Sequence, residues 1–202
     1  SNNPILLLAN YAMKGYILNL QGKTLDSSTF SYQGFEEQSF VETFTAAAPT
    51  WIAIYKRFKI QSLVTWGFYE QAYVLVQERE QWLALMGAID VEWKSAYYTF
   101  SSIATFQCYK QGKIEKEEAA LILKEAVDEL NILYQVNAKT IGGMYHIVLA
   151  QQAEFENKVL EVMDYYDVAV KSALSAKLLL YVAIANELAA EFYISINKEE
   201  FA

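Results

Sequence analysis

The chain has 202 residues, 54% of them hydrophobic, and a formal net charge of −8 at pH 7. This length suffices for one ordinary domain with a sizeable core, and we expect a single domain over residues 1–202. The negative charge argues against a nucleic-acid surface, and the single cysteine excludes an internal disulfide and cysteine-based zinc sites. No stretch reaches the roughly 18 apolar residues of a membrane-spanning helix, and we expect a reducing, cytoplasmic setting.

The residue types predict an all-α fold. Proline occurs only at Pro4 and Pro49, so the chain after Pro49 contains none. A β-rich chain of this size needs more turn residues. Alanine, leucine, glutamate, lysine and glutamine are abundant, and these residues lose least on entering a helix. Several long helices joined by short loops indicate a helical bundle or a stack of antiparallel helical hairpins.

The N-terminal part of the chain is predicted to begin with a helix over residues 4–21, because Pro4 suits the first helical position. Residues 23–34 are rich in serine, threonine and glycine and predict a loop. A short helix is expected over 35–47. Pro49 starts another helix, and the helical pattern extends to residue 86 with a break near Trp66-Gly67.

The C-terminal part is predicted to contain four helices. The first two cover residues 91–110 and 113–136, separated by Gln111-Gly112. From residue 141 to residue 162, apolar side chains recur at spacings of four and three, which predicts one long helix of about six turns. We expect a break at 164–167 and a final helix over 168–196.

No catalytic constellation is evident. The only histidine is His146, so a serine-histidine-aspartate, cysteine-histidine or two-histidine metal site would have to include it. A lone histidine in an apolar helix is more often a core residue, and Cys108 lies on a different predicted helix. The sequence therefore predicts no catalytic residue, metal site or cofactor, and a protein that is not an enzyme.

One basic cluster stands out, formed by Lys56, Arg57 and Lys59. We interpret it as a solvated helix face. A peripheral contact with anionic membrane lipids is the alternative for this cluster.

The final predicted helix carries more apolar surface than a surface helix needs. Two stripes run along it at different angles, one formed by Leu174, Leu178 and Val182 and the other by Leu180, Ile184 and Leu188. Such a helix is either buried centrally or offers one stripe to something outside the domain. In the second case, apolar residues four apart serve as anchors for a partner helix, and Leu174, Leu178 and Val182 are the candidate binding residues.

Four separated segments of the chain resemble segments of the ALIX-type BRO domain, a helical scaffold of the endosomal-sorting (ESCRT) system, and they follow one another in the order found in that family. The most specific is Val148-Leu-Ala-Gln-Gln-Ala-Glu154, followed by Phe155 and Lys158, which is similar to the apolar-Leu-Ala-Gln-Ala-Gln-Glu motif of that family. Also similar are Lys171-Ser-Ala-Leu-Ser-Ala-Lys-Leu178 with the aromatic end at 187–193, the segment 92–111, and Leu63-Val-Thr-Trp66. The resemblance covers roughly residues 63–193.

The resemblance implies a hairpin stack related to tetratricopeptide repeats and a non-enzymatic recognition function. In this family an exposed apolar patch binds the amphipathic C-terminal helix of an ESCRT-III subunit of the Snf7 type. Leu174 and Leu178 fall on aliphatic positions of that patch. We therefore expect a monomeric scaffold for protein–protein interaction in endosomal sorting or membrane remodelling, cytoplasmic and associated with endosomes.

Two other functions fit the same sequence. A membrane-active helical bundle, either pore-forming or lipid-binding, would explain the aromatic content and the long helices. A structural homo-oligomer would bury the stripe of Leu174 and Leu178 against its own copy.

Overall fold

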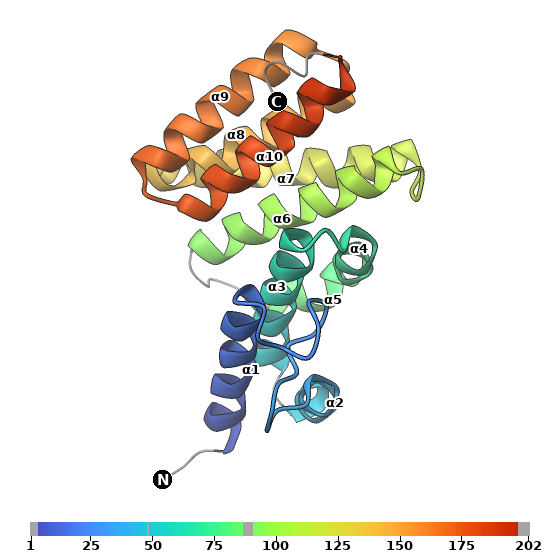
Figure 1. Ribbon diagram of the computed structural model, residues 1–202, viewed down its shortest axis with the longest axis vertical. Coiled ribbons are helices and arrows are strands. Elements are labelled where there is room, and N and C mark those ends of the chain that lie inside the picture. Colours follow the sequence, from blue (N-terminus) through green and yellow to red (C-terminus); the bar gives the residue numbers. More distant parts are fainter. Residues whose placement is uncertain (1–3, 48, 87–90, 198–202) are drawn as a thin grey trace. The chain divides into compact units, whose positions relative to one another are not determined.

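The computed structural model describes residues 4–47, 49–86 and 91–197. These residues form ten α-helices and no β-strand apart from an isolated bridge between Tyr32 and Phe35, so the all-α prediction is confirmed (Figure 1). The chain divides into two compact units, residues 1–90 and 91–202, and each is described by itself. The expectation of a single domain stays a prediction.

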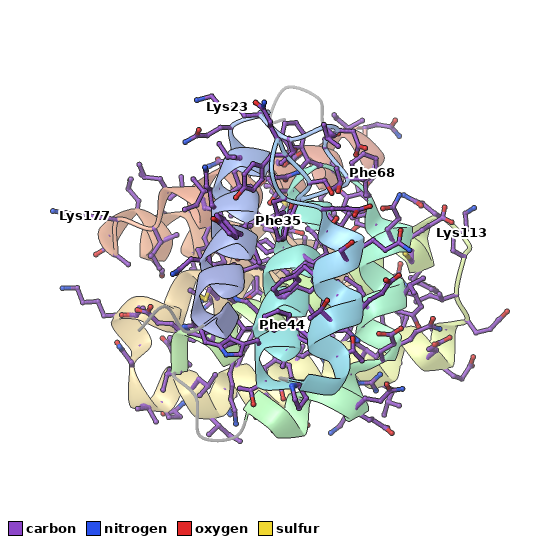
Figure 2. The ribbon with its side chains drawn as sticks, turned by 90° about the horizontal axis from the view of Figure 1, so that it is seen from below. Lys23, Phe35, Phe44, Phe68, Lys113 and Lys177 are labelled. Carbon is purple, nitrogen blue, oxygen red and sulfur yellow. The ribbon has the colours of Figure 1, made fainter. Side chains whose placement is uncertain are left out.

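The N-terminal unit is organised around one central helix. Its helices are α1 (Pro4–Leu20), α2 (Glu37–Ala47), α3 (Pro49–Thr65), α4 (Tyr69–Gln77) and α5 (Arg79–Met86). The central helix is α3, which packs against the other four. Aromatic side chains fill the core of this unit. Phe35 and Phe44 are buried (Figure 2), and so is Phe30 from the loop that precedes α2.

The C-terminal unit is a series of helices that run back and forth (Figure 1). They are α6 (Val91–Lys110), α7 (Lys116–Val136), α8 (Ala138–Phe155), α9 (Val159–Ser175) and α10 (Leu179–Ser195). Each helix packs against the next, and α8 also contacts α6 and α10, so α8 is the centre of the unit. This arrangement agrees with the predicted bundle or hairpin stack. The last helix, α10, packs on α9 and on part of α8.

Two predicted helices of this unit are wrong. The chain turns at residues 156–158 and 176–178, so neither 141–162 nor 168–196 is one helix, and the break expected at 164–167 lies inside α9. Asn157 and Lys177 both have φ of 60°. Beyond each, an amide N–H bonds back to a carbonyl five residues earlier, from Lys158 to Ala153 and from Leu178 to Ala173, both at 2.9 Å. This is the Schellman ending of a helix.

The helices α8 and α9 approach each other closely because two glycines face α9. A methyl group added to Gly143 would lie 2.7 Å from the Cβ of Ala173 and 3.1 Å from its backbone nitrogen. A methyl group added to the neighbouring Gly142 would lie 3.2 Å from the Cβ of Ser172. The glycine pair therefore permits a helix crossing that larger residues would prevent, and it fixes α9 as the support on which α10 packs.

We predict that Gly143→Ala destabilises the protein by about 1–3 kcal/mol, because overpacking outweighs the gain of about 1 kcal/mol from replacing glycine in a helix. The double variant Gly143→Ala with Ala173→Gly should recover part of the loss, since it removes the methyl–methyl clash. Urea unfolding followed by circular dichroism measures both. A Gly143→Ala variant as stable as the parent would contradict the close crossing.

Candidate functional site

A groove with a volume of about 680 Å³ lies between α9 and α10. It is lined by Tyr166, Asp167, Val170 and Lys171 of α9, and by Asn186, Glu187, Ala189, Ala190 and Tyr193 of α10. We call this surface the α9–α10 groove. Its floor is apolar and narrow, because Val170, Ala189 and Ala190 are half-buried and two of them carry only a methyl group. Its rims are polar and exposed at Asp167, Lys171 and Glu187.

The structure does not place Leu174, Leu178 and Val182 on one helix, so the predicted continuous stripe is wrong. Leu174 lies in the last turn of α9, Leu178 is the N-cap residue of α10, and Val182 lies in the first turn of α10. The reason is the reversal at Lys177, whose side chain points outward from the turn (Figure 2).

None of these three residues belongs to the lining of the α9–α10 groove, but the turn keeps them beside the end of the groove that is nearest to residues 176–178. Leu174 follows Val170 by four residues and therefore lies on the same face of α9. Val182 precedes Asn186 by four residues and shares its face of α10 in the same way. Leu174 is 58% exposed, and Leu178 and Val182 are half-buried. Leu174 and Val182 thus continue the two faces that line the groove toward the turn, and their role in binding stays a prediction.

The second predicted stripe has the opposite role. Ile184 and Leu188 are buried and Leu180 is half-buried. They alternate with Tyr181, Ala185 and Phe192, which are also buried. This face of α10 packs on α9 and α8. The second stripe therefore lies in the core, whereas Leu174 of the first stripe lies on the surface.

The end of the groove away from the turn carries negative charge. Lys171 lies 3.5 Å from the carboxylate of Asp167, and Asp164 and Glu187 are exposed. Partial burial raises the pKa of Tyr193, and the nearby carboxylates of Asp167 and Asp164 raise it further. The tyrosine hydroxyl therefore stays protonated at neutral pH.

A second hollow, of about 260 Å³, lies where α6, α8 and α10 end. Lys110 sits between two carboxylates, with its Nζ 3.6 Å from an oxygen of Glu154 and 3.6 Å from an oxygen of Glu191. Gln107 donates a hydrogen bond of 2.7 Å to Glu191. Burial raises the pKa of Glu154, Lys110 opposes this, and Glu191 adds to it. The cluster ties three helix ends together through Glu154, the last residue of the Gln-Gln-Ala-Glu motif.

The N-terminal unit contains a buried ion pair. Lys59 donates to both carboxylate oxygens of Glu37, at 2.6 and 2.8 Å, and to the carbonyl of Ser28 at 2.6 Å. Tyr55 and the backbone N–H of Phe30 also donate to Glu37, at 2.6 and 3.0 Å. Burial lowers the pKa of Lys59, against the effect of Glu37, and raises that of Tyr55. Lys59 and Tyr55 lie on α3, and the bonds of the pair to Ser28 and Phe30 hold the loop before α2 against this helix.

This ion pair corrects one sequence interpretation. The solvated face predicted for the basic cluster is wrong for Lys59, whose side chain is only 11% exposed. Lys56 is also engaged, because it bonds the carboxylate of Glu78, and the guanidinium of Arg57 lies 4.4 Å from the ring centre of Phe58. The membrane contact proposed for the cluster stays untested.

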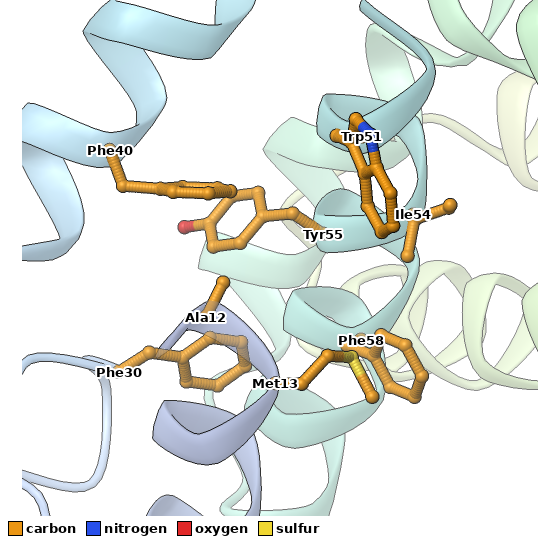
Figure 3. Close-up of a pocket in the computed structure, with 8 residues that line it drawn as sticks. All are labelled: Ala12, Met13, Phe30, Phe40, Trp51, Ile54, Tyr55 and Phe58. Atoms are coloured by element: carbon orange, nitrogen blue, oxygen red, sulfur yellow. The ribbon is translucent and has the colours of Figure 1, made fainter. Parts of the chain in front are cut away.

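An aromatic hollow lies next to this pair, between α1, α2 and α3 (Figure 3). Phe30, Phe40, Trp51, Tyr55 and Phe58 turn their rings toward it. Its free volume is about 10 Å³, the space of about one water molecule. The hollow is part of the packed core and is too small for an organic ligand.

The residues with catalytic chemistry are engaged in packing. His146 places its Nδ1 2.7 Å from the carbonyl oxygen of Gly142, and its ring lies among Tyr134, Tyr145 and Tyr165. Cys108 is buried. Over residues 4–47, 49–86 and 91–197, no group of three histidine, cysteine or acidic side chains is placed to hold a metal ion. In the same ranges, no helix has the length and apolar character needed to cross a membrane.

Comparisons of the chain with protein-family models, with curated proteins and with solved structures gave no match.

Sequence reasoning missed the floor and the acidic rim of the groove. Ala189 and Ala190 carry no signal of their own, because small residues are common in every helix. In the sequence Glu187 stands only as the first residue of an aromatic helix end. A signal for the reversals existed at Asn157, since asparagine is one of the few non-glycine residues that adopt a left-handed conformation readily.

Glu154 provides a pH test of the cluster at the helix ends. Its raised pKa means that the fold disfavours the ionised carboxylate. This cost is absent below about pH 4.5, the ordinary value, and appears in full once the pH exceeds the raised pKa. The melting temperature of Glu154→Gln should therefore rise relative to that of the parent as the pH increases from 4 to 7.

Thermal unfolding at several pH values measures this difference. The exposed Glu117 on α7 offers a matched control, because Glu117→Gln should show no comparable rise. A difference between Glu154→Gln and the parent that is constant with pH, or that falls toward neutral pH, would contradict the assigned environment.

Proposed function

We propose that this protein is a non-enzymatic helical scaffold that binds a short amphipathic helix of a partner protein in the α9–α10 groove. The observation that carries the proposal is the groove itself, about 680 Å³ in volume, with Leu174 exposed four residues beyond its lining residue Val170 on α9. From Asn186 to Tyr193 the groove lining spans about 10 Å of α10, at about 1.5 Å per residue, which matches two turns of a bound helix.

The physical basis of binding is the burial of apolar side chains of the partner. Ala189 and Ala190 on the floor let a helix approach closely, as small residues do where helices pack. Leu174 and Val182 would pack against the apolar side chains that the partner presents at positions i, i+3 and i+4. The exposed polar rims fix its orientation rather than supply most of the affinity.

The candidate partner is the amphipathic C-terminal helix of an ESCRT-III subunit of the Snf7 type. It comes from the resemblance of the segments around Glu154 and Leu178 to the ALIX-type BRO domain. A scaffold of this kind acts in endosomal sorting or membrane remodelling, at the endosomal membrane.

We predict saturable binding of a fluorescent Snf7-type helix peptide, measured by anisotropy. Leu174→Asp should weaken it about 5- to 150-fold, because truncating a buried leucine anchor costs about 1–3 kcal/mol. Leu178→Asp should also weaken it, and aspartate is a preferred N-cap residue, so this variant keeps α10 well capped.

The matched control is Leu121→Asp on α7. Leu121 is 62% exposed, so this variant makes the same substitution at an exposed leucine outside the groove. Its binding should equal that of the parent, and circular dichroism checks that all variants fold. Absence of binding at high micromolar protein would overturn the ESCRT-III partner. A dimer by light scattering that Leu174→Asp dissociates would assign the groove to a second copy, and binding of the protein alone to lipid vesicles would assign it to a membrane.

A further inference from the structure

The charge along the α9–α10 groove is uneven. Asp167 and Glu187 line it, the exposed Asp164 lies one turn before Asp167 on α9, and Lys171 is the basic residue among the lining. Lys171 is already 3.5 Å from Asp167. Neither Asp164 nor Glu187 has an ion-pair partner within the described part of the chain. At least two carboxylates are therefore left to face whatever fills the groove.

Tyr193, which lines the groove, lies close to two of the same carboxylates. Its pKa is raised by burial and then by the charges of Asp167 and Asp164, so the carboxylates act on a hydroxyl in the groove lining itself. Its half-buried ring also offers an apolar and π-rich surface to the stem and charge of a lysine or arginine.

The acidic end and the apolar end are separated by a fixed distance along the helix. Asp167 and Asp164 lie seven and ten residues before Leu174 on α9, which corresponds to two to three turns and about 10–15 Å. The groove is thus polarised, with leucine side chains near the turn and carboxylates two to three turns away. An occupant that satisfies both ends has an elongated shape and matching chemistry at that spacing.

From this arrangement we infer that the bound partner is a helix whose apolar face is flanked by lysine or arginine, two to three turns from the residue that contacts Leu174. This inference rests on the proposed function and adds the chemistry of the partner. The cations of the partner lie against Asp164 and Glu187, and its apolar residues lie against Leu174 and Val182. The net charge of −8 attracts a basic segment at long range in the same direction.

The test compares three 18-residue peptides with identical leucine and alanine positions and with lysine, glutamine or glutamate at the flanking positions. We expect the lysine peptide to bind the full chain about tenfold more tightly than the glutamine peptide at low salt, because a few exposed ion pairs contribute an effect of that size. The ratio should shrink toward one in 500 mM salt. The glutamate peptide should bind most weakly.

The variant Asp164→Asn with Glu187→Gln should abolish the preference for the lysine peptide while leaving glutamine-peptide binding unchanged. These two carboxylates are chosen because their removal leaves no lysine unpaired. The control variant Glu115→Gln with Glu117→Gln changes the net charge equally, near the start of α7, and should keep the tenfold ratio. Circular dichroism confirms that both variants fold.

Three outcomes are decisive. A lysine preference that is lost in the groove variant and kept in the control supports the inference. Equal binding of all three peptides, a preference for the glutamate peptide, or a lysine preference that both variants lose equally overturns the inference and leaves a helix-binding scaffold. Failure of all three peptides to bind overturns the scaffold as well.

Discussion

The α9–α10 groove depends on one backbone conformation, the left-handed residue Lys177. With φ at 60°, Lys177 reverses the chain within three residues. A lysine in this conformation costs about 1–2 kcal/mol relative to the ordinary helical region. Two Schellman hydrogen bonds, from Lys177 to Leu174 at 3.0 Å and from Leu178 to Ala173 at 2.9 Å, stabilise the reversal. Burial of Ile184 on the returning helix offsets the remaining cost of the left-handed conformation.

The position of the groove follows from how α9 is held. Gly142 and Gly143 let α8 approach α9 so closely that Ala169 and Ala173 are fully buried. This leaves the opposite face of α9, with Asp167, Lys171 and Leu174, exposed to solvent. The returning helix α10 then covers one side of α9 rather than its outer face, so a groove forms between the two helices instead of a closed core.

The sequence predicted well those helices whose ends carry glycine. Glycine adopts positive φ without a steric cost, and Gly22, Gly67 and Gly112 each stand just beyond a helix at φ between 66° and 77°. The turns at Asn157 and Lys177 were missed for a specific reason. Apolar residues keep a spacing of four across both of them, as Phe155 to Val159 and Leu174 to Leu178 show, so periodicity alone gives one unbroken helix.

The candidate site was predictable only in part. The excess of apolar surface around Leu174, Leu178 and Val182 was visible in the sequence, and the exposed position of Leu174 accords with it. The groove floor and the acidic end were not visible, because Ala190 and Glu187 meet Val170 and Asp167 only after the chain reverses. Asp164 and Asp167, taken as a break, instead lie on the exposed face of a continuous helix.

The distance between residues 167 and 187 tests the central claim most directly. Spin labels on cysteines replacing Asp167 and Glu187, in a chain with Cys108→Ala, report it by electron paramagnetic resonance. The reversal at Lys177 places the two labels on neighbouring helices, whose axes are about 8–10 Å apart, so strong dipolar broadening is expected. A separation of about 30 Å, as along one uninterrupted helix, would contradict the hairpin and with it the groove.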